Sequence, residues 1–176
     1  MCGVPYHAAP NYIARLVRKG YRVAICEQTE TPTKGTKLVK REVVRVITPG
    51  TAIDPQLVEA KDTVYLASIC GSGDTFGAAF LETSSGSFAT TEIRGADAWN
   101  KIRDEIESRS PRELLYPCSL EKLVESSFGG GNVSAGLFTE REQSPQSNSI
   151  TLTPLDDASF DERASTSLLE KQMEVA

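Results

Sequence analysis

Three β-rich runs follow one another between residues 64 and 93, and this succession constrains the fold more than any other feature of the chain. The runs at 64–70, 76–83 and 87–93 are rich in apolar and β-branched side chains. Two short connections, Gly71-Ser72-Gly73-Asp74 and Ser84-Ser85-Gly86, separate them. Glycine and small polar residues in such short connections are typical of tight turns between neighbouring strands. The pattern therefore predicts an antiparallel meander.

After the meander, helical and extended patterns alternate, which predicts an α/β fold. Trp99, Ile102 and Ile106 recur at helical spacing, so we expect them to point inward from an amphipathic helix. Ser119 is a suitable N-cap for the next helix. The predicted elements are a helix at 96–108, a strand at 114–116, a helix at 119–125, a polar loop at 129–149 around a weak strand at 133–138, and a helix at 160–174.

The first 62 residues have a different order of elements. Pro10 suits a first helical turn, Ile13, Leu16 and Val17 form one apolar face, and Gly20 is a natural stop. We expect a helix at 10–19, strands at 21–27 and 40–47 around a polar loop at 29–37, a turn at 48–51 and a helical linker at 53–62. The predicted domains are residues 1–54 and 63–176, with residues 55–62 as the linker.

Charge is divided unevenly between these two parts. Residues 1–51 carry nine Lys and Arg against three Glu, a net charge of +6. Residues 52–176 carry ten Lys and Arg against twenty-one Asp and Glu, a net charge of −11. Because phosphate binding depends on the local density of Lys and Arg, this division favours contact of the first part with a polyanion. A solvated basic surface without a partner is the alternative.

Composition narrows the class of protein further. No apolar run approaches the roughly 18 residues that a membrane span requires, and the N-terminus lacks the layout of a secretory signal. The only histidine is His7, and the cysteines form no C-x-x-C pair, so a zinc site is not predicted. Free thiols in a reducing cytoplasm are the expectation for Cys2, Cys26, Cys70 and Cys118.

Three short sequence motifs in the first 51 residues resemble those of a known family. They are Met1-Cys2-Gly3-Val4-Pro5-Tyr6-His7-Ala8, Cys26-Glu27-Gln28-Thr29-Glu30-Thr31-Pro32 and Val43-Val44-Arg45-Val46-Ile47-Thr48-Pro49-Gly50-Thr51. In this order and at these intervals they resemble the MutS family of DNA mismatch-repair proteins. The words at 81–88 and 111–116 are similar to the family's connector domain. The resemblance implies the rear of a mixed α/β mismatch-binding domain, beginning in mid-domain, followed by a ribonuclease H-like connector domain truncated at its C-terminus.

The resemblance also implies where DNA is contacted. Arg45 matches an arginine that the family places against the DNA backbone, and Met1 matches a methionine near the minor groove. Lys40 and Arg41 would add phosphate attraction, as would Arg15 and Arg18, although solvated surface charge is the alternative for each. Tyr6 and His7 carry a family word, and a packed, hydrogen-bonded pair is expected rather than a catalyst.

The family reads mismatches with a Phe-x-Glu motif that precedes the Gly-Val-Pro-Tyr-His word. The aromatic side chain stacks at the mismatched step, which unstacks at low cost. Three Phe-x-Glu strings occur later in this chain, beginning at Phe80, Phe138 and Phe160. We expect all three to be coincidental, because they lie in the acidic part, and the mismatch reader to be absent.

We expect no enzyme activity from this chain. The sequence contains no Gly-Lys pair of a G-x-x-x-x-G-K-[ST] phosphate loop, so ATP and magnesium belong to the parent family and not to these residues. The resemblance implies mismatched duplex DNA as ligand, a MutL-like partner bound through the connector, and a homodimeric parent. A free-standing nucleic-acid interaction module is one alternative.

A ribonuclease H-like nuclease is the other alternative. Such sites hold two metals on carboxylates and need an acid within the first strand. Residues 64–70 contain none, and Glu82 and Asp74 are predicted at a strand end and in a turn. These two positions do not predict a cluster.

Overall fold

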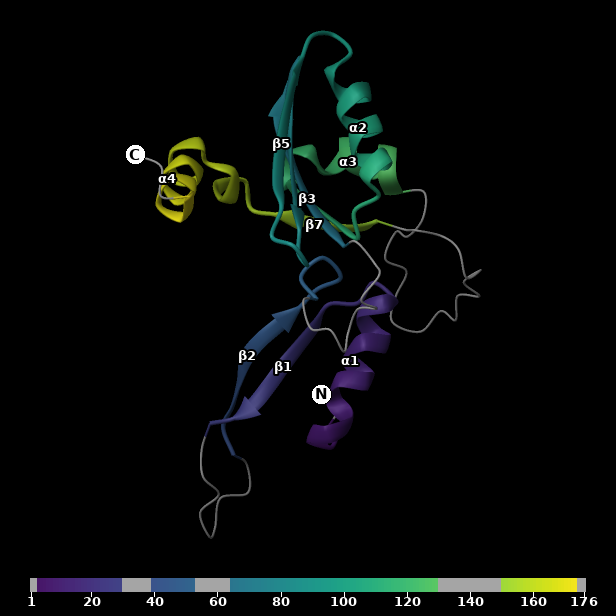
Figure 1. Cartoon of the computed structure of the whole chain (residues 1–176), viewed down its shortest axis with the longest axis vertical. Helices are drawn as coiled ribbons and strands as arrows, with labels where there is room; N and C mark the ends of the chain where they lie inside the picture. The colour runs from purple at the N-terminus through teal and green to yellow at the C-terminus, as the bar shows by residue number, and fades with distance from the viewer. Residues whose placement is uncertain (1–2, 30–38, 53–63, 130–149, 174–176) are drawn as a thin grey trace. The chain divides into compact units, whose positions relative to one another are not determined.

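The chain forms two compact units, Met1–Thr63 and Val64–Ala176, which are described separately. The computed structural model describes residues 3–29, 39–52, 64–129 and 150–173, and these contain both helices and sheets (Figure 1). The α/β fold class expected from the sequence is therefore confirmed. The predicted linker at 55–62 lies outside the described residues.

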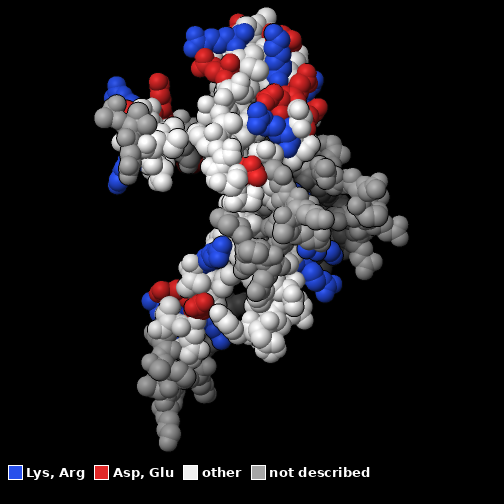
Figure 2. Space-filling view, viewed as in Figure 1, with Lys and Arg blue, Asp and Glu red and all other residues white. Residues whose placement is uncertain are grey.

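The two units differ in the distribution of their surface charge. On the second unit, acidic and basic side chains are interspersed. In the same view, the side of the first unit formed by helix α1 (Ala9–Arg18) shows Lys and Arg alone (Figure 2). None of the described helices is long and apolar enough to cross a membrane. Cys26, Cys70 and Cys118 are free thiols.

Helix α1 (Ala9–Arg18) follows a short 3-10 turn, η1 (Tyr6–Ala8), and has Pro10 in its first turn. Gly20 follows the C-cap residue Lys19, and its φ of 82° is accessible to glycine at little cost. The N–H of Gly20 donates to the carbonyl of Val17, and the N–H of Tyr21 donates to that of Leu16. These two bonds form a Schellman motif. The predicted helix at 10–19 and its stop are confirmed.

The strands β1 (Val23–Gln28) and β2 (Arg41–Ile47) form an antiparallel two-stranded sheet. β1 begins two residues later than predicted because Tyr21 is used in closing α1. One face of this sheet packs on α1. The shared core consists of Ala14, Val17, Ile47 and Ala52, with Ile13, Val23 and Ile25 packed against it.

The predicted turn at 48–51 follows β2 directly. The N–H of Thr51 donates to the carbonyl of Thr48, and the two threonine hydroxyls lie 2.7 Å apart. Pro49 and Gly50 between them are buried. The turn therefore closes the core of the first unit at the end of β2.

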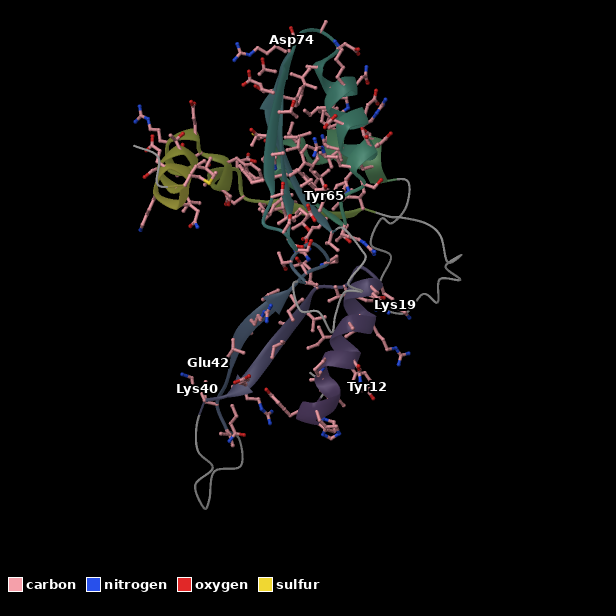
Figure 3. All side chains as sticks on the ribbon, viewed as in Figure 1. Tyr12, Lys19, Lys40, Glu42, Tyr65 and Asp74 are labelled. Atoms are coloured by element: carbon pink, nitrogen blue, oxygen red, sulfur yellow. The ribbon has the colours of Figure 1, made fainter. Side chains whose placement is uncertain are left out.

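The second unit contains the predicted meander at one side of a five-stranded sheet. The strands lie in the order β5-β4-β3-β6-β7, with the first three antiparallel and the last three parallel to one another. Tyr65 and Asp74, labelled in Figure 3, mark the start of β3 and the turn that follows it. The bounds are β3 Tyr65–Ser72, β4 Thr75–Glu82, β5 Phe88–Arg94, β6 Glu113–Pro117 and β7 Thr151–Leu155.

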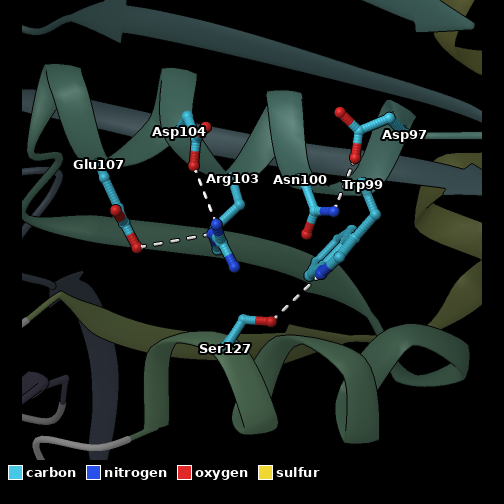
Figure 4. A network of polar contacts seen from close by, with 7 residues as sticks. All are labelled: Asp97, Trp99, Asn100, Arg103, Asp104, Glu107 and Ser127. Carbon is cyan, nitrogen blue, oxygen red and sulfur yellow. Dashed lines mark hydrogen bonds and ion pairs between the residues drawn. The ribbon is translucent and has the colours of Figure 1, made fainter.

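Helices α2 (Ala98–Arg109) and α3 (Glu121–Phe128) cover one face of this sheet. Ile102 and Ile106 are fully buried and Trp99 is half-buried, as the sequence predicted. The indole N–H of Trp99 donates to the hydroxyl of Ser127 on α3 at 3.2 Å (Figure 4). The Trp99 ring also meets Phe76 edge-on. Trp99 therefore joins the two helices and the sheet.

The start of α3 differs from the sequence prediction. Ser119 is not a helix N-cap, because it lies in a 3-10 turn, η2 (Cys118–Leu120), and α3 begins only after Leu120. Its N–H donates instead to Oδ1 of Asp157 (3.0 Å). This bond ties η2 to η4 (Asp157–Phe160), the 3-10 turn that leads into α4 (Glu162–Met173).

Strand β7 was not predicted, and its proline explains why. Pro154 lacks a backbone N–H, which argues against a strand, but β7 is the edge of the sheet, where proline is tolerated. The weak strand expected at 133–138 lies outside the described residues. The final helix at 160–174 is present as η4 and α4.

A buried carboxylate joins β6 to β7. Glu113 is only 1% exposed, and its Oε1 accepts a hydrogen bond from the Thr153 hydroxyl at 2.7 Å. Its side chain points to the sheet face opposite to Leu114 and Tyr116, which belong to the core beneath the helices. A buried carboxylate requires such partners.

Replacement of Thr153 by Val is expected to destabilise the second unit by about 1–3 kcal/mol, because it removes a hydrogen bond to the buried Glu113 carboxylate. Trp99 is the only tryptophan, so its fluorescence during urea unfolding reports on this unit. Thr151→Val, on the same face of the same strand, is the matched control and should change stability by less than about 0.5 kcal/mol. Equal effects of the two substitutions would contradict the role of this bond.

Gly71→Ala is expected to cost about 2–4 kcal/mol, since Gly71 has a φ of 142° and an added Cβ would lie 2.3 Å from the Thr75 carbonyl oxygen. Gly71 lies in β3, and Gly73, in the turn that follows this strand, also has a positive φ of 57°, but a Cβ there meets nothing within 4 Å. Gly73→Ala should therefore cost only about 1 kcal/mol. Trp99 fluorescence in urea measures both, and a Gly73 variant as unstable as the Gly71 variant would refute the steric explanation.

Candidate nucleic-acid interface

Three of the four sequence-predicted DNA-binding residues lie at or next to β2. Lys40 directly precedes the strand, Arg41 is its first residue and Arg45 lies in its middle. All three side chains are exposed. The strand forms because β-branched valines and an isoleucine occupy most of its length. The fourth residue, Met1, lies outside the described residues.

A β-bulge at Val44 decides which way each arginine points. Arg45 pairs with Ile25 and Val43 pairs with Cys26, so Val44 has no partner on β1. Paired residues in an antiparallel sheet share a face, and neighbouring residues on one strand alternate. Arg45 therefore shares the α1 side of the sheet with Ile25, and Val43 points to the opposite side.

Arg41 lies on that opposite side as well, because it pairs with Gln28, two residues from Cys26. The bulge thus separates Arg41 from Arg45, although their spacing of four would place them together on a regular strand. The far side also carries apolar side chains. Val43, Val44 and Val46 are 57%, 52% and 54% exposed.

Lys40 forms an ion pair with Glu42. Its Nζ lies 2.6 Å from Oε1 of Glu42, and both side chains are exposed (Figure 3). Glu42 in turn pairs across the sheet with Glu27, and like charges placed directly opposite one another repel. Lys40 therefore offsets a pair of carboxylates, and less of its charge is available to a ligand than that of an unpaired lysine.

The expectation that Tyr6 and His7 form a packed pair is wrong. Tyr6 is 91% exposed, and His7 is exposed beside it in η1. The turn places both residues before α1, at a point where the described part of the first unit contains nothing to cover them. These side chains are on the surface and accessible to a ligand.

The Phe-x-Glu strings do not present an aromatic wedge in the described residues. Phe80 is only 1% exposed, and the Arg109 guanidinium lies 4.5 Å from the centre of its ring. Phe160 is half-buried at the end of η4. The string beginning at Phe138 lies outside the described residues.

The acids that a nuclease would need are far apart. Asp74 directly precedes β4 and Glu82 is its last residue, so at 3.3 Å per residue the two are about 26 Å apart. Glu113 lies on the other face of the sheet from Glu82, because it pairs with Leu66 whereas Glu82 pairs with Tyr65. In the described part of the chain, no three His, Cys, Asp or Glu side chains converge on a possible metal site.

Comparison with known families agrees with the two units. A family model described as MutS domain I matches residues 1–56, and one described as MutS domain II matches residues 64–175. The second match alone covers more than half of the chain.

Individual relatives give the same assignment. The DNA mismatch repair protein MutS of Syntrophomonas wolfei is 39% identical over 176 residues, which is all of this chain and 19% of that protein. The proteins of that name from Symbiobacterium thermophilum and Alkaliphilus metalliredigens are 43% identical over 143 residues and 49% identical over 122 residues. These cover 80% and 69% of this chain, and 16% and 14% of the relatives. The chain spans less than a fifth of the length of these relatives, and it belongs to the MutS family.

Proposed function

We propose that this chain is a segment of a DNA mismatch-recognition protein and supplies part of the surface that holds duplex DNA. The observation that carries the proposal is the exposed basic strand β2 within residues 1–51, which carry a net charge of +6, in a chain of the MutS family. Lys and Arg side chains on such a surface bind phosphates without reading base sequence. In this proposal the basic surface of the chain positions the DNA.

Arg45 is the principal contact in this proposal. It is exposed in the middle of β2 and has no acid within ion-pair distance among the described residues. Arg41 points to the opposite side of the sheet, so it contacts a different part of the backbone or none. Lys40 contributes less because Glu42 holds it. Met1 is assigned a place near the minor groove by resemblance alone.

Reading of the mismatch is assigned to other parts of the parent protein. The Phe-x-Glu phenylalanines in the described residues are buried or half-buried, and stacking on a base requires an accessible ring. ATP does not fit this chain, whose sequence lacks a Gly-Lys phosphate loop, so we assign ATP and magnesium to the parent as well. The chain itself has no catalytic role in this proposal.

The second unit serves contacts with proteins. Residues 64–176 carry nine Lys and Arg against eighteen Asp and Glu, a net charge of −9, which disfavours the approach of DNA. We assign the MutL-like partner to this unit and a dimeric state to the parent, acting in the cytoplasm. The same charge division also supports a second candidate, a free-standing nucleic-acid module, which differs in binding DNA without the rest of a parent.

Replacement of Arg45 by Gln should weaken binding of any duplex and lower the slope of log K against log salt by about 1, because one phosphate is no longer neutralised. Fluorescence anisotropy with a labelled duplex of about 20 bp, between 50 and 200 mM salt, measures both. Lys122→Gln removes one exposed charge from α3 and is the control. An unchanged slope for the Arg45 variant would remove this residue from the interface.

The chain is expected to bind a duplex with a single G·T mismatch no more than about twofold more tightly than the matched duplex, since phosphate contacts carry no base information. Competition between the two unlabelled duplexes for a bound labelled one gives the ratio directly. A preference of tenfold or more would show that the mismatch reader lies within these residues. It would overturn the assignment made above.

A further inference from the structure

A row of side chains on α1 faces away from the sheet of the first unit. Tyr12 and Arg15 lie in α1, and Lys19 is its C-cap residue. Their spacings of three and four residues place them along one side of the helix. The opposite side, with Ala14 and Val17, is buried against the sheet. Figure 3 shows Tyr12 and Lys19 on the side of α1 that points away from β1 and β2.

These side chains are accessible. Tyr12 is 51% exposed, and Arg15 and Lys19 are exposed as well. The Schellman motif at Gly20 fixes the backbone at the helix end, where Lys19 is the C-cap residue. Four residues of α-helix separate the two cations by about 6 Å along the axis.

The charge of this row is not compensated by acids. Residues 1–26 contain Arg15, Arg18, Lys19 and Arg22 but no Asp or Glu. Among the described residues, Arg15 and Lys19 have no ion pair. On the second unit, by contrast, Arg94, Arg103 and Arg109 each lie within ion-pair distance of a carboxylate. A helix C-terminus favours cations only within its last turn, which does not explain the absence of acids over 26 residues.

We propose that the outward side of α1, formed by Tyr12, Arg15 and Lys19, is a second surface for the phosphate backbone of duplex DNA. Its two cations pair with phosphates, and the Tyr12 hydroxyl donates a hydrogen bond to a phosphate oxygen, as Tyr commonly does in DNA complexes. This inference rests on the proposed function for its ligand.

The position of α1 makes this surface separate from Arg41. α1 packs on the face of the sheet that carries Val23, Ile25 and Ile47, whereas Arg41 lies on the other face. The sheet therefore separates Arg41 from the outward side of α1. A straight stretch of duplex touches one of them, and the first unit offers phosphate-binding groups on both of its sides.

The test compares two double variants of the full 176-residue chain. Arg15→Gln with Lys19→Gln should lower the salt slope of duplex binding by about 1.8, since each phosphate that is no longer neutralised lowers it by about 0.9. Lys101→Gln with Lys122→Gln removes the same charge from exposed positions of α2 and α3 and should leave the slope unchanged. Circular dichroism of each variant shows that the fold is kept.

The outcomes separate this inference from the proposed function. If the α1 variant binds like the wild type while Arg45→Gln weakens binding, the α1 surface is refuted and the proposed function stands. If the wild-type chain does not bind duplex DNA, both fail. If the control double variant lowers the slope as much as the α1 variant does, the effect is one of net charge, and the α1 surface is refuted.

A measurement without substitutions gives an independent result. Acylation of surface lysines by an amine-reactive ester, followed by mass spectrometry, reports the accessibility of each lysine with and without duplex DNA. Lys19 should be protected by duplex DNA while Lys122 is not. Single-stranded DNA that protects Lys19 better than duplex, together with loss of that protection in Tyr12→Ala, would overturn duplex as the ligand in favour of base stacking.

Discussion

The pairing of β1 with β2, including the unpaired Val44, determines what the first unit presents to its surroundings. Side chains on a strand alternate between two faces, so a single extra residue inverts every position beyond it. Without the bulge, Ile47 in the core would bring Arg45, Val43 and Arg41 onto the α1 side together. The bulge allows Ile47 to remain buried while Arg41 and Val43 turn outward. The arginines of one strand are thus divided between two surfaces.

Stability is distributed unequally between the units. The second unit buries aromatic and aliphatic side chains such as Phe80, Ile106 and Tyr116 between a five-stranded sheet and two helices, and Trp99 links these layers. The core of the first unit is small, with Ala14, Val17, Ile47 and Ala52 as its buried members, while three valines of β2 remain more than half exposed. Apolar exposure of this extent on neighbouring residues marks a surface that can be covered by another part of a protein.

Local sequence signals predicted those parts of the fold that depend on neighbouring residues. Pro10 and Gly20 bracket α1, glycine-containing turns delimit the meander, and the spacing of Ile102 and Ile106 gave the buried side of α2. β7 was missed because Pro154 is compatible only with an edge strand, and strand order is a long-range property.

The candidate site was predicted less completely, for a related reason. The sequence placed Lys40, Arg41 and Arg45 in one predicted strand, but the bulge that separates the arginines depends on the register with β1, which no local pattern encodes. The Lys40–Glu42 ion pair has a local spacing of two and could have been expected from strand alternation. The exposure of Tyr6 and His7 depends on what packs over η1, so it could not be derived from their types alone.

A chain with net charge −5 can still bind a polyanion because charge acts locally in salt solution. At physiological ionic strength, exposed charges separated by more than about 8 Å are largely screened from one another. The acids of the second unit are in part neutralised by their own neighbours, as in the Arg94–Glu92 and Arg109–Glu105 pairs. No acid occurs in the first 26 residues to do the same for Arg15 and Lys19. A phosphate approaching α1 therefore encounters a positive surface, whatever the sign of the total charge.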